Sequence, residues 1–510
     1  MMYRINEIKL RLGEDKGSIP EKIKEKLKTK AEIKSYRIAK ESVDARDKGD
    51  ILYVYTVDFD TDAEFPNLKK APNSSYTPPT PGTGLMKGRP VIAGFGPCGM
   101  FAALVLSELG YAPVVLERGK QVDERVKDVE RFWKDGILDE ESNVQFGEGG
   151  AGAFSDGKLT TGIKDARVGK VLRELVLAGA GDDILYKQHP HVGTDVLRGV
   201  VKNIRKKIVE NGGELMFQTR LEGIVSSEGR LEAVKASSPA GDFEIKTQTL
   251  ILAVGHSARD TIRALGKDGV LMEQKPFSIG IRIEHLQEAI NEAQYGKNAD
   301  KRLPPAEYKL AHRCRNGRGV YTFCMCPGGE VIAASSQKGF LATNGMSNRA
   351  RDGERANSAV LVDVRVSDYD SSDPLSGIAF QEKYESAAYW MAGGRYQPLP
   401  TTWGEFANGA KTAQPVINSL PGFAVSGIRE AMPVFANKLK GFDNQGAVVY
   451  AVESRSSSPV RIMRNKDFQC NIAGVYPCGE GAGYSGGIMS AAVDGINAAE
   501  EIVRKFSRRE

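Results

Sequence analysis

Three spaced glycines between a short strand and a helix constrain the fold of this chain more than any other feature. The segment RPVIAGFGPCGMFAALVLSELGYAPVVLERG places Gly94, Gly96 and Gly99 after the apolar run 91–93 and before the strongly apolar stretch 100–109. The first run predicts a buried strand and the second a buried helix. Gly94 permits a tight turn, Gly96 lets the backbone approach a pyrophosphate, and Gly99 lets helix and strand pack closely. The pattern predicts an α/β fold of the Rossmann type.

An acidic residue completes this pattern. Residues 112–116 predict a second strand of the same sheet, and Glu117 follows directly. A carboxylate at this position accepts hydrogen bonds from ribose hydroxyls and repels a 2′-phosphate. The helix N-terminus favours a pyrophosphate because its free N–H groups and its dipole attract anions. With strand, helix, second strand and acid in register, the sequence predicts a dinucleotide site.

The composition is that of a globular protein and excludes several other classes. Of the 510 residues, 41% are hydrophobic and 26% are charged, which rules out a disordered, collagenous or coiled-coil chain. The length suggests about three domains or one large composite one. A net charge of +5 is too small to predict a nucleic-acid partner. Six cysteines make no secreted disulfide framework, and no apolar run is long enough to span a membrane. We therefore expect a cytoplasmic protein that acts on a small molecule.

The first 65 residues predict a small separate unit. The segments YRINEIKLRL, IKSYRIAKESVD and DILYVYTVDFD have the alternation of strands, and PEKIKEKLK reads as a short basic helix. This order predicts an α/β module in which a helix packs on a sheet. Its role is open between a packing appendage and a lid or docking module. Residues 66–87 are rich in Pro, Ser, Thr and Gly and predict a linker.

The tail of the chain resembles a known group of proteins. The segment GVYPCGEGAGYSGGIMSAAVDGINAAEEI resembles the closing motif of the large superfamily of FAD-dependent oxidoreductases that includes glutathione reductase. The resemblance implies that Glu480, after Gly479, holds the ribityl chain of the flavin. It also implies that Gly487 and Ile488 open a helix whose N-terminus points at the isoalloxazine. The helix dipole there stabilises negative charge on the reduced ring.

Two further blocks look like parts of the same superfamily. TLILAVGHSARD resembles its intermediate strand, which ends in a glycine turn at Gly255. QFGEGGAGAFSDGKL is rich in glycine, which suits a backbone that passes close to a ligand, and the alternative is a flexible surface loop. The blocks together imply FAD in preference to NAD. The residues expected to bind it are Gly94, Gly96, Pro97, Cys98, Gly99, Glu117, Arg118, Gly150, Gly152, Ser155, Lys158, Gly255, Gly479, Glu480, Gly487 and Ile488.

A fuller resemblance is to a bacterial family of FAD-dependent (NAD/FAD-utilising) dehydrogenases. It rests on the segments HPHVGTD, KPFSIGIRIEH, GVYTFCMCPGGEVI, NGMSNRARDGERANSA and VESRSSSPVRI, and it covers nearly the whole chain. We therefore expect a Rossmann-type FAD-binding domain with an inserted mixed α+β substrate domain and a small N-terminal α/β module. The expected boundaries are 1–65 for the module, 66–87 for the linker, 88–270 and 455–510 for the FAD-binding domain, and 271–454 for the substrate domain.

The activity expected from these resemblances is that of a dehydrogenase or reductase that moves a hydride through flavin N5. The chain has a single dinucleotide fingerprint and lacks the C-x4-C pair of the disulfide reductases. NAD(P)H, as a transient electron donor, would bind without a nucleotide domain of its own. A monooxygenase is one alternative. An FAD-bound protein that senses redox state or scaffolds a partner is another.

The candidates for the catalytic machinery are His191, Arg282, Cys324 and Cys326. His191 follows another histidine in HPHVGTD, and an imidazole is a natural proton carrier near neutral pH. The competing interpretation makes Thr194 or Asp195 a helix cap and leaves the histidines structural. Arg282 lies on an alternating strand, where it could meet an acidic substrate or form a structural ion pair.

The cysteines around residue 320 permit three interpretations. Residues two apart in a strand face the same side, so both Cys324 and Cys326 could line one pocket as a redox pair near the flavin. The second interpretation is a metal site formed by Cys324 and Cys326 together with His312 and Cys314, although zinc sites prefer C-x2–4-C spacing. The third interpretation is that the thiols pack as small hydrophobic groups. We assign no metal ligand among them. Arg455, just before the closing block, is a further candidate contact to flavin or substrate.

Overall fold

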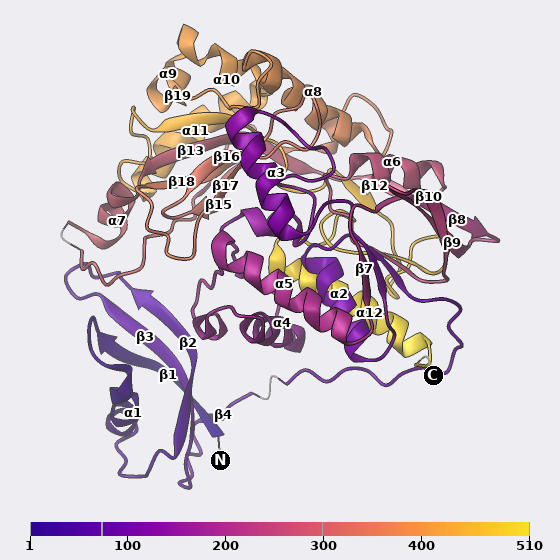
Figure 1. The fold of residues 1–510 in the computed structure, drawn as a ribbon. Coiled ribbons are helices and arrows are strands. Elements are labelled where there is room, and N and C mark those ends of the chain that lie inside the picture. Colours follow the sequence, from indigo (N-terminus) through magenta and orange to yellow (C-terminus); the bar gives the residue numbers. More distant parts are fainter. Residues whose placement is uncertain (1, 73–74, 298, 509–510) are drawn as a thin grey trace.

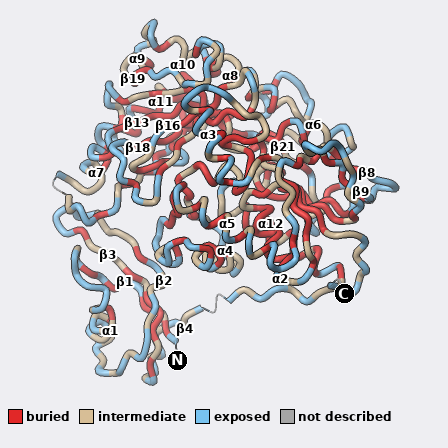
Figure 2. The backbone as a smooth tube through the Cα atoms, viewed as in Figure 1, coloured by how far each residue is buried: buried red, intermediate tan, exposed pale blue. Residues whose placement is uncertain are grey.

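Five short parallel strands form the sheet that carries the glycine motif (Figure 1). The computed structural model describes residues 2–72, 75–297 and 299–508. The order across this sheet is β22-β11-β5-β6-β7, and every neighbouring pair is parallel. Strands β5, β6 and β11 are apolar throughout, because helices cover one face of the sheet and a second sheet covers the other. They belong to the buried part of the chain, which is red in Figure 2. The strands are β5 (Val91–Ala93), β6 (Val114–Leu116), β7 (Glu214–Met216), β11 (Leu250–Leu252) and β22 (Val475–Pro477).

Helices cover one face of the parallel sheet. Helix α2, which follows the glycine motif, is buried almost all round because α12 and α5 pack against it. Ile92, Val115 and Ile251 point from the sheet into this layer. The predicted helix after the motif and the closing helix are therefore confirmed. The helices of this part are α2 (Pro97–Glu108), α3 (Val122–Asp135), α4 (Ala166–Leu177), α5 (Thr194–Glu210) and α12 (Ile488–Lys505).

A three-stranded antiparallel sheet and one helix cover the opposite face. Val91, Val114 and Leu250 point into this second core, where they meet apolar residues of the small sheet. The sheet order is β10-β9-β8. Its elements are β8 (Arg220–Ser227), β9 (Arg230–Ser238), β10 (Gly241–Lys246) and the neighbouring helix α6 (Arg259–Lys267).

A mixed α+β domain is inserted between β11 and β22. Its centre is a six-stranded antiparallel sheet in the order β14-β15-β18-β13-β20-β19. Helix α11 (Gly422–Lys438) lies across this sheet and buries Ile428, Met432 and Phe435 against it (Figure 1). The strands are β13 (Phe277–Leu286), β14 (Ala311–Arg313), β15 (Gly319–Cys326), β18 (Arg355–Val364), β19 (Thr401–Thr402) and β20 (Val448–Glu453).

Two short strand pairs complete the inserted region. One pair joins the domains, since β12 precedes the six-stranded sheet and β21 follows it. The other lies beside the large sheet and carries Asn344. These strands are β12 (Met272–Gln274), β21 (Val460–Ile462), β16 (Glu330–Ala333) and β17 (Thr343–Met346). The remaining helices are α7 (Gln287–Tyr295), α8 (Ser376–Met391), α9 (Trp403–Asn408) and α10 (Gln414–Asn418).

The amino-terminal module has its own core and docks on the rest of the molecule. Its sheet has the order β2-β3-β1-β4, with α1 packed on it, and both the three predicted strands and the predicted helix are confirmed. The backbone of Glu41 exchanges hydrogen bonds with Tyr186 and Gln188, at 2.8 and 2.9 Å. The elements are β1 (Met2–Arg11), α1 (Ile19–Leu27), β2 (Ser35–Asp44), β3 (Leu52–Asp60) and β4 (Lys69–Lys70).

The segment predicted as a linker makes specific contacts at both ends. Lys69 and Lys70 form β4, which pairs with β1. Farther along, the amides of Gly82 and Gly84 donate to the carbonyls of Val503 and Lys505 at the end of α12. The extended chain between module and sheet is therefore tied to the closing helix, as Figure 1 shows along its lower edge. Within the described residues, none of the helices is both long and apolar enough for a membrane span.

Candidate functional site

A cavity of about 270 Å³ opens at the carboxyl ends of the central parallel strands. This is where ligands bind in open α/β sheets. One wall consists of the glycine loop after β5, the loop after β11 and the start of α12. The other wall comes from the inserted domain, with Cys324, Asn344 and Glu453 among its residues. The cavity therefore lies between the nucleotide-type sheet and the inserted sheet.

The glycines of the motif have the geometry that their spacing predicts. Gly94 has φ +99°, and a Cβ on it would lie 2.4 Å from the carbonyl oxygen of Ala253. A Cβ on Gly99 would lie 1.9 Å from the carbonyl oxygen of Gly94, so no side chain fits where α2 meets the strand. Gly96 is the N-cap of α2, with its Cα against the backbone of Gly150 in the second glycine-rich loop. The α2 N-terminus thus faces the cavity with bare backbone, as a pyrophosphate requires.

The acid that ends β6 is fixed by backbone amides. Glu117 is buried, and its carboxylate accepts hydrogen bonds from the amides of Phe95, Gly119 and Gly147 at 2.8 to 2.9 Å. A carboxylate has about four acceptor positions, so about one remains for a ribose hydroxyl. The residue also lines the cavity.

A second carboxylate, that of Glu480, also lines the cavity. Glu480 follows β22, and burial raises its pKa to about 7, against the opposing effect of Lys275. Its Oε1 lies 3.5 Å from Nδ1 of His256, whose pKa burial lowers to about 3 with the help of Arg455. His256 is therefore neutral near pH 7.

His256 also carries an unsatisfied polar atom. Its Nε2 is buried and has no hydrogen-bond partner within the part of the chain that the structure describes. The residue lines the cavity. A buried ring nitrogen without a partner is costly, and a bound polar ligand removes that cost. The lining therefore fits a polar dinucleotide.

The start of α12 closes the nucleotide wall. Gly487 is its N-cap, with φ +88°, and a Cβ on Gly152 would lie 3.4 Å from Ile488 and 3.8 Å from Pro97. Free N–H groups at this N-terminus favour negative charge. The predicted cofactor-binding residues that line the cavity are Gly94, Gly96, Pro97, Cys98, Glu117, Arg118, Gly150, Gly152, Ser155, Gly255, Gly479, Glu480, Gly487 and Ile488.

Two predicted cofactor residues have other contacts. Gly99 packs against Gly94 beneath the loop, which is the packing role assigned to it above. Lys158 donates from Nζ to the carbonyl of Met325 in the inserted domain.

Cys98 lines the cavity, where a hydrogen bond with Cys478 and burial together raise its pKa well above the usual value for a thiol.

The predicted catalytic residues His191 and Arg282 are not among the residues that line the cavity. Nε2 of His191 donates to the carbonyl of Arg349 at 3.0 Å, and burial lowers its pKa to about 4. The expectation that Thr194 or Asp195 caps the helix is wrong, because Gly193 is the N-cap of α5 and both residues lie inside the helix. Asp195 accepts instead from the amide of Arg349. A catalytic role for His191 stays a prediction.

Arg282 is held by close contacts with Glu453, Asn357 and Cys324, and by longer ones with Asn344 and Cys326. Its Nη1 contacts both carboxylate oxygens of Glu453 at 3.0 Å, Nε donates to Asn357 at 2.8 Å, and Nη2 donates to the carbonyl of Cys324 at 2.6 Å. Burial disfavours its charge, but Glu453 and the neighbouring thiols outweigh burial and raise its pKa. Burial raises the pKa of Glu453 by more than the charge of Arg282 lowers it. Arg282 thus forms the structural ion pair that the sequence left open, and it holds two residues of the cavity wall.

The expectation that Cys324 and Cys326 line one pocket is wrong. Strand β15 changes register between Phe323 and Cys326, and Cys324 has φ +43°, which is the geometry of a β-bulge. The extra residue breaks the alternation on which the expectation depended. Cys324 lines the cavity and is exposed toward it, whereas Cys326 is buried with its thiol 3.3 Å from the carbonyl of Cys324.

Several residues of the lining could not be assigned from the sequence. His256 follows Gly255 directly, and this position after a strand end was the one signal that pointed to it. Asn344 and Glu453 belong to the inserted sheets and had no local pattern. Arg455, which the sequence suggested as a contact, does line the cavity, and its Nη1 donates to Ser257 and Ser336.

The sequence of this chain matches a known protein family and a known protein. Residues 276–456 match a family described as "FAD-dependent protein, C-terminal domain-like", and residues 2–60 match a domain of unknown function. A protein of Clostridium beijerinckii, described as an uncharacterized protein, is 45% identical and is matched over 99% of each chain. The chain belongs to the same family as this Clostridium beijerinckii protein, and its residues 276–456 match the FAD-dependent C-terminal domain. FAD is its cofactor, and the glycine loops, Glu117 and Glu480 line the cavity described above.

Solved structures show more distant similarity. The FAD complex of the glycerol-3-phosphate dehydrogenase of Bacillus halodurans is 12% identical, with a TM-score of 0.36 over 81% of this chain and 64% of the dehydrogenase. A flavin-dependent brominase is 13% identical, with a TM-score of 0.39 over 82% of this chain and 80% of the brominase.

Proposed function

We propose that this protein is an FAD-dependent oxidoreductase that moves a hydride through flavin N5 between a nicotinamide nucleotide and a small-molecule substrate. The observation that carries the proposal is the two-sided cavity. One wall has the glycine loops of a dinucleotide site, and the other has polar side chains of the inserted domain. FAD supplies a two-electron centre that accepts and returns a hydride. The polar wall is the natural place for a substrate next to it.

Glu453 is our candidate for the group that holds or moves a proton on the substrate side. It lines the cavity and is 5% exposed, and burial raises its pKa above the usual value of a carboxyl. Arg282 fixes both of its oxygens at 3.0 Å. A general acid or base works best when its pKa is near the working pH and its position is fixed. Arg282 is then a positioning residue rather than a catalytic one.

The charge beside this wall favours an anionic group. Arg455 and Arg259 both pair with Glu385, so two buried guanidiniums share one carboxylate. Burial lowers the pKa of Arg455, although Glu385 opposes that effect. An excess positive charge in a buried site attracts negative charge. Arg455 would stabilise either the anionic reduced cofactor or an acidic substrate.

Two alternatives stay open beside this proposal. An FAD-dependent monooxygenase would use the same cavity and consume NAD(P)H only with oxygen and a hydroxylated substrate. A redox-sensing or scaffold protein would use FAD as a signal and the module of residues 1–65 as its docking surface. Its flavin would respond to redox state without turnover.

The decisive measurement is the anaerobic visible spectrum of the purified protein before and after NADH, and then NADPH. We expect a flavin band that bleaches with one of the two nucleotides. A Glu453→Gln variant should keep the band and bleach at the same rate, but pass its electrons to substrates more slowly. A protein that neither retains nor rebinds flavin contradicts the proposal. A flavin band that neither nucleotide reduces contradicts the nicotinamide donor.

A further inference from the structure

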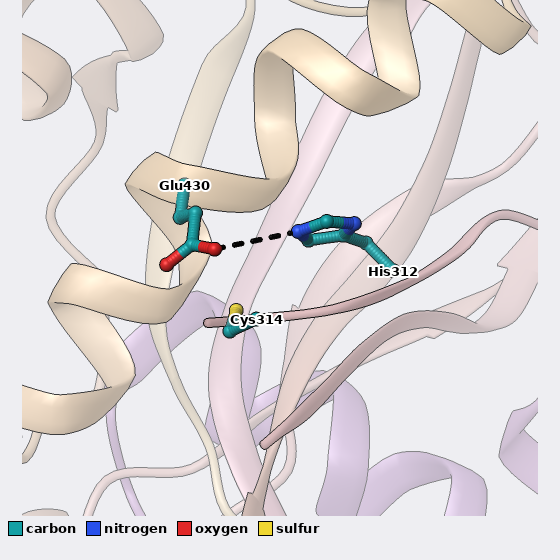
Figure 3. A group of neighbouring side chains, drawn as sticks. All are labelled: His312, Cys314 and Glu430. Carbon is teal, nitrogen blue, oxygen red and sulfur yellow. Dashed lines mark ion pairs between the residues drawn. The ribbon is translucent and has the colours of Figure 1, made fainter. Parts of the chain in front are cut away.

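His312, Cys314 and Glu430 meet at the edge of the six-stranded sheet (Figure 3). His312 lies on the edge strand β14, Cys314 follows this strand directly, and Glu430 lies on helix α11. One imidazole nitrogen, one sulfur and one carboxylate oxygen lie within 4.8 Å of one another. None of the three residues belongs to the cavity lining described above. The cluster therefore needs an explanation separate from the flavin site.

The spacing of imidazole and carboxylate does not suit a hydrogen bond. Nε2 of His312 lies 3.5 Å from Oε1 of Glu430, whereas hydrogen bonds of this type span about 2.7–3.2 Å. Nε2 is buried and lacks a hydrogen-bond partner among the residues whose positions are described. Two ligands of one tetrahedral zinc ion, with bonds of about 2.0–2.2 Å, lie about 3.3–3.6 Å apart. The observed separation is that of two ligands to one ion.

The third group and its surroundings complete the donor set. The thiol of Cys314 is buried, and its nearest polar contact is the carbonyl of Gly427 at 3.7 Å, a weak interaction. The amide of Arg315 donates to Oε1 of Glu430 at 2.8 Å and so orients the carboxylate. Such outer contacts are usual for metal ligands. Thiolate and carboxylate together carry two negative charges, which a divalent ion neutralises.

We propose that His312, Cys314 and Glu430 bind one zinc ion, with water in the fourth position. A mixed nitrogen, sulfur and oxygen set suits zinc, whereas magnesium and calcium prefer oxygen ligands alone. The ion would join edge strand β14 to helix α11, two elements brought together only by the fold. Its effect is structural, because it ties the helix that covers the sheet to the end of that sheet. This site is independent of the proposed function.

The test uses the full-length holoprotein after dialysis against a chelator. Zinc is titrated in competition with a chromophoric chelator, and cobalt is then added as a spectroscopic substitute. We expect one zinc per chain and, with cobalt, the charge-transfer band of a thiolate ligand. Zinc should also raise the melting temperature.

Variants identify the ligands. Cys314→Ala, His312→Gln and Glu430→Gln should each lower zinc affinity at least tenfold, and Cys314→Ala should abolish the thiolate band. Cys470→Ala is the matched control, because Cys470 is also buried but belongs to another core. It should bind zinc like the wild type. Flavin content per chain shows that each variant is folded.

Two results overturn the proposal. One is a wild-type protein that binds no zinc at this stoichiometry, as a simple ion pair between His312 and Glu430 predicts. The other is zinc binding that survives Cys314→Ala or is lost equally in Cys470→Ala. Binding that survives Cys314→Ala would place the ion at other residues, and equal loss in Cys470→Ala would mean that the effect is not specific to Cys314.

Discussion

Gly99 lies at a point of helix–strand contact that has no room for a side chain. A Cβ there would lie 1.9 Å from the carbonyl of Gly94 and 3.2 Å from Ile92. Gly99→Ala should therefore destabilise the protein by about 1–3 kcal/mol and shift the glycine loop. We expect a lower melting temperature and less FAD per chain, measured by thermal unfolding and by absorbance.

The matched control for Gly99→Ala is Gly199→Ala. Gly199 lies in helix α5, and a Cβ there meets open space. Alanine at this position should stabilise the protein by about 0.5–1 kcal/mol through helix propensity. If both variants unfold at the wild-type temperature and keep full FAD content, the close contact at Gly99 is not what the motif requires.

Glu480 combines a stability cost with the cofactor-binding role that we predict for it. Burial raises its pKa from 4.5 to about 7. Between these values the folded apoprotein binds more protons than the unfolded chain, so its stability falls as pH rises through this window. Glu480→Gln removes the cost. Above pH 7 the variant apoprotein should be more stable than the wild type by about 1–2 kcal/mol, allowing for exposure to the cavity.

The same variant should bind the cofactor less well. Hydrogen bonds to a charged group are worth about 1.5–3 kcal/mol, so the loss of the carboxylate should weaken FAD affinity at least about tenfold. Urea unfolding of apoprotein at pH 5 and pH 8 and fluorescence titration with FAD measure the two effects. Equal stability of variant and wild type at both pH values, with unchanged affinity, would remove Glu480 from the site.

Helices α6 and α8 are joined by a buried ion cluster. The guanidinium of Arg259 contacts both oxygens of Glu385 at 2.8 and 2.9 Å, and Arg455 contacts them at 2.8 and 3.1 Å. Both arginines lower the pKa of Glu385 far enough to outweigh burial. Glu385→Gln leaves two buried cations facing each other and should cost about 3–5 kcal/mol. Chemical denaturation measures this loss.

Glu382→Gln is the control on the same helix. Glu382 pairs with Arg263 at 2.7 Å, but that arginine is 39% exposed, and the buried Arg259 is more distant, at 3.9 Å. Pairs of this kind contribute less than about 1 kcal/mol. If the two variants lose equal stability, the buried cluster does not hold the helices together.

The strand, turn and helix around the glycine motif could be predicted because each depends on local periodicity. Residues 91–93 and 250–252 are apolar runs that are each followed by a glycine turn, at Gly94 and Gly255, and the structure has strands there. The partners of Glu385 and Glu430 could not be predicted, because the fold alone brings them to Arg259 and Cys314. The bulge at Cys324 was also beyond prediction, since it depends on how β15 pairs with β18.

At the scale of the whole molecule, the amino-terminal module touches the body outside the flavin cavity. Its contacts include those of the backbone of Glu41 with Tyr186 and Gln188, of Lys48 with the carbonyl of Ala293, and of Tyr53 with the carbonyl of Arg302. Deletion of residues 1–72 should therefore leave FAD content and the anaerobic rate of flavin reduction unchanged. Lost FAD or a changed rate would instead give the module a part in the site, as the lid interpretation requires.

The order in which the chain is synthesised decides when this protein can acquire its cofactor. Strand β22 and helix α12 pair with β11 and pack against α2, yet they lie at the far end of the sequence. Ribosomes add about 5–20 residues per second, so Val475 follows Ala93 by on the order of half a minute. During that interval the nascent sheet has an open edge and an uncovered apolar helix. Cofactor capture must therefore wait until β22 and α12 have been synthesised, and the half-built domain is a natural chaperone client.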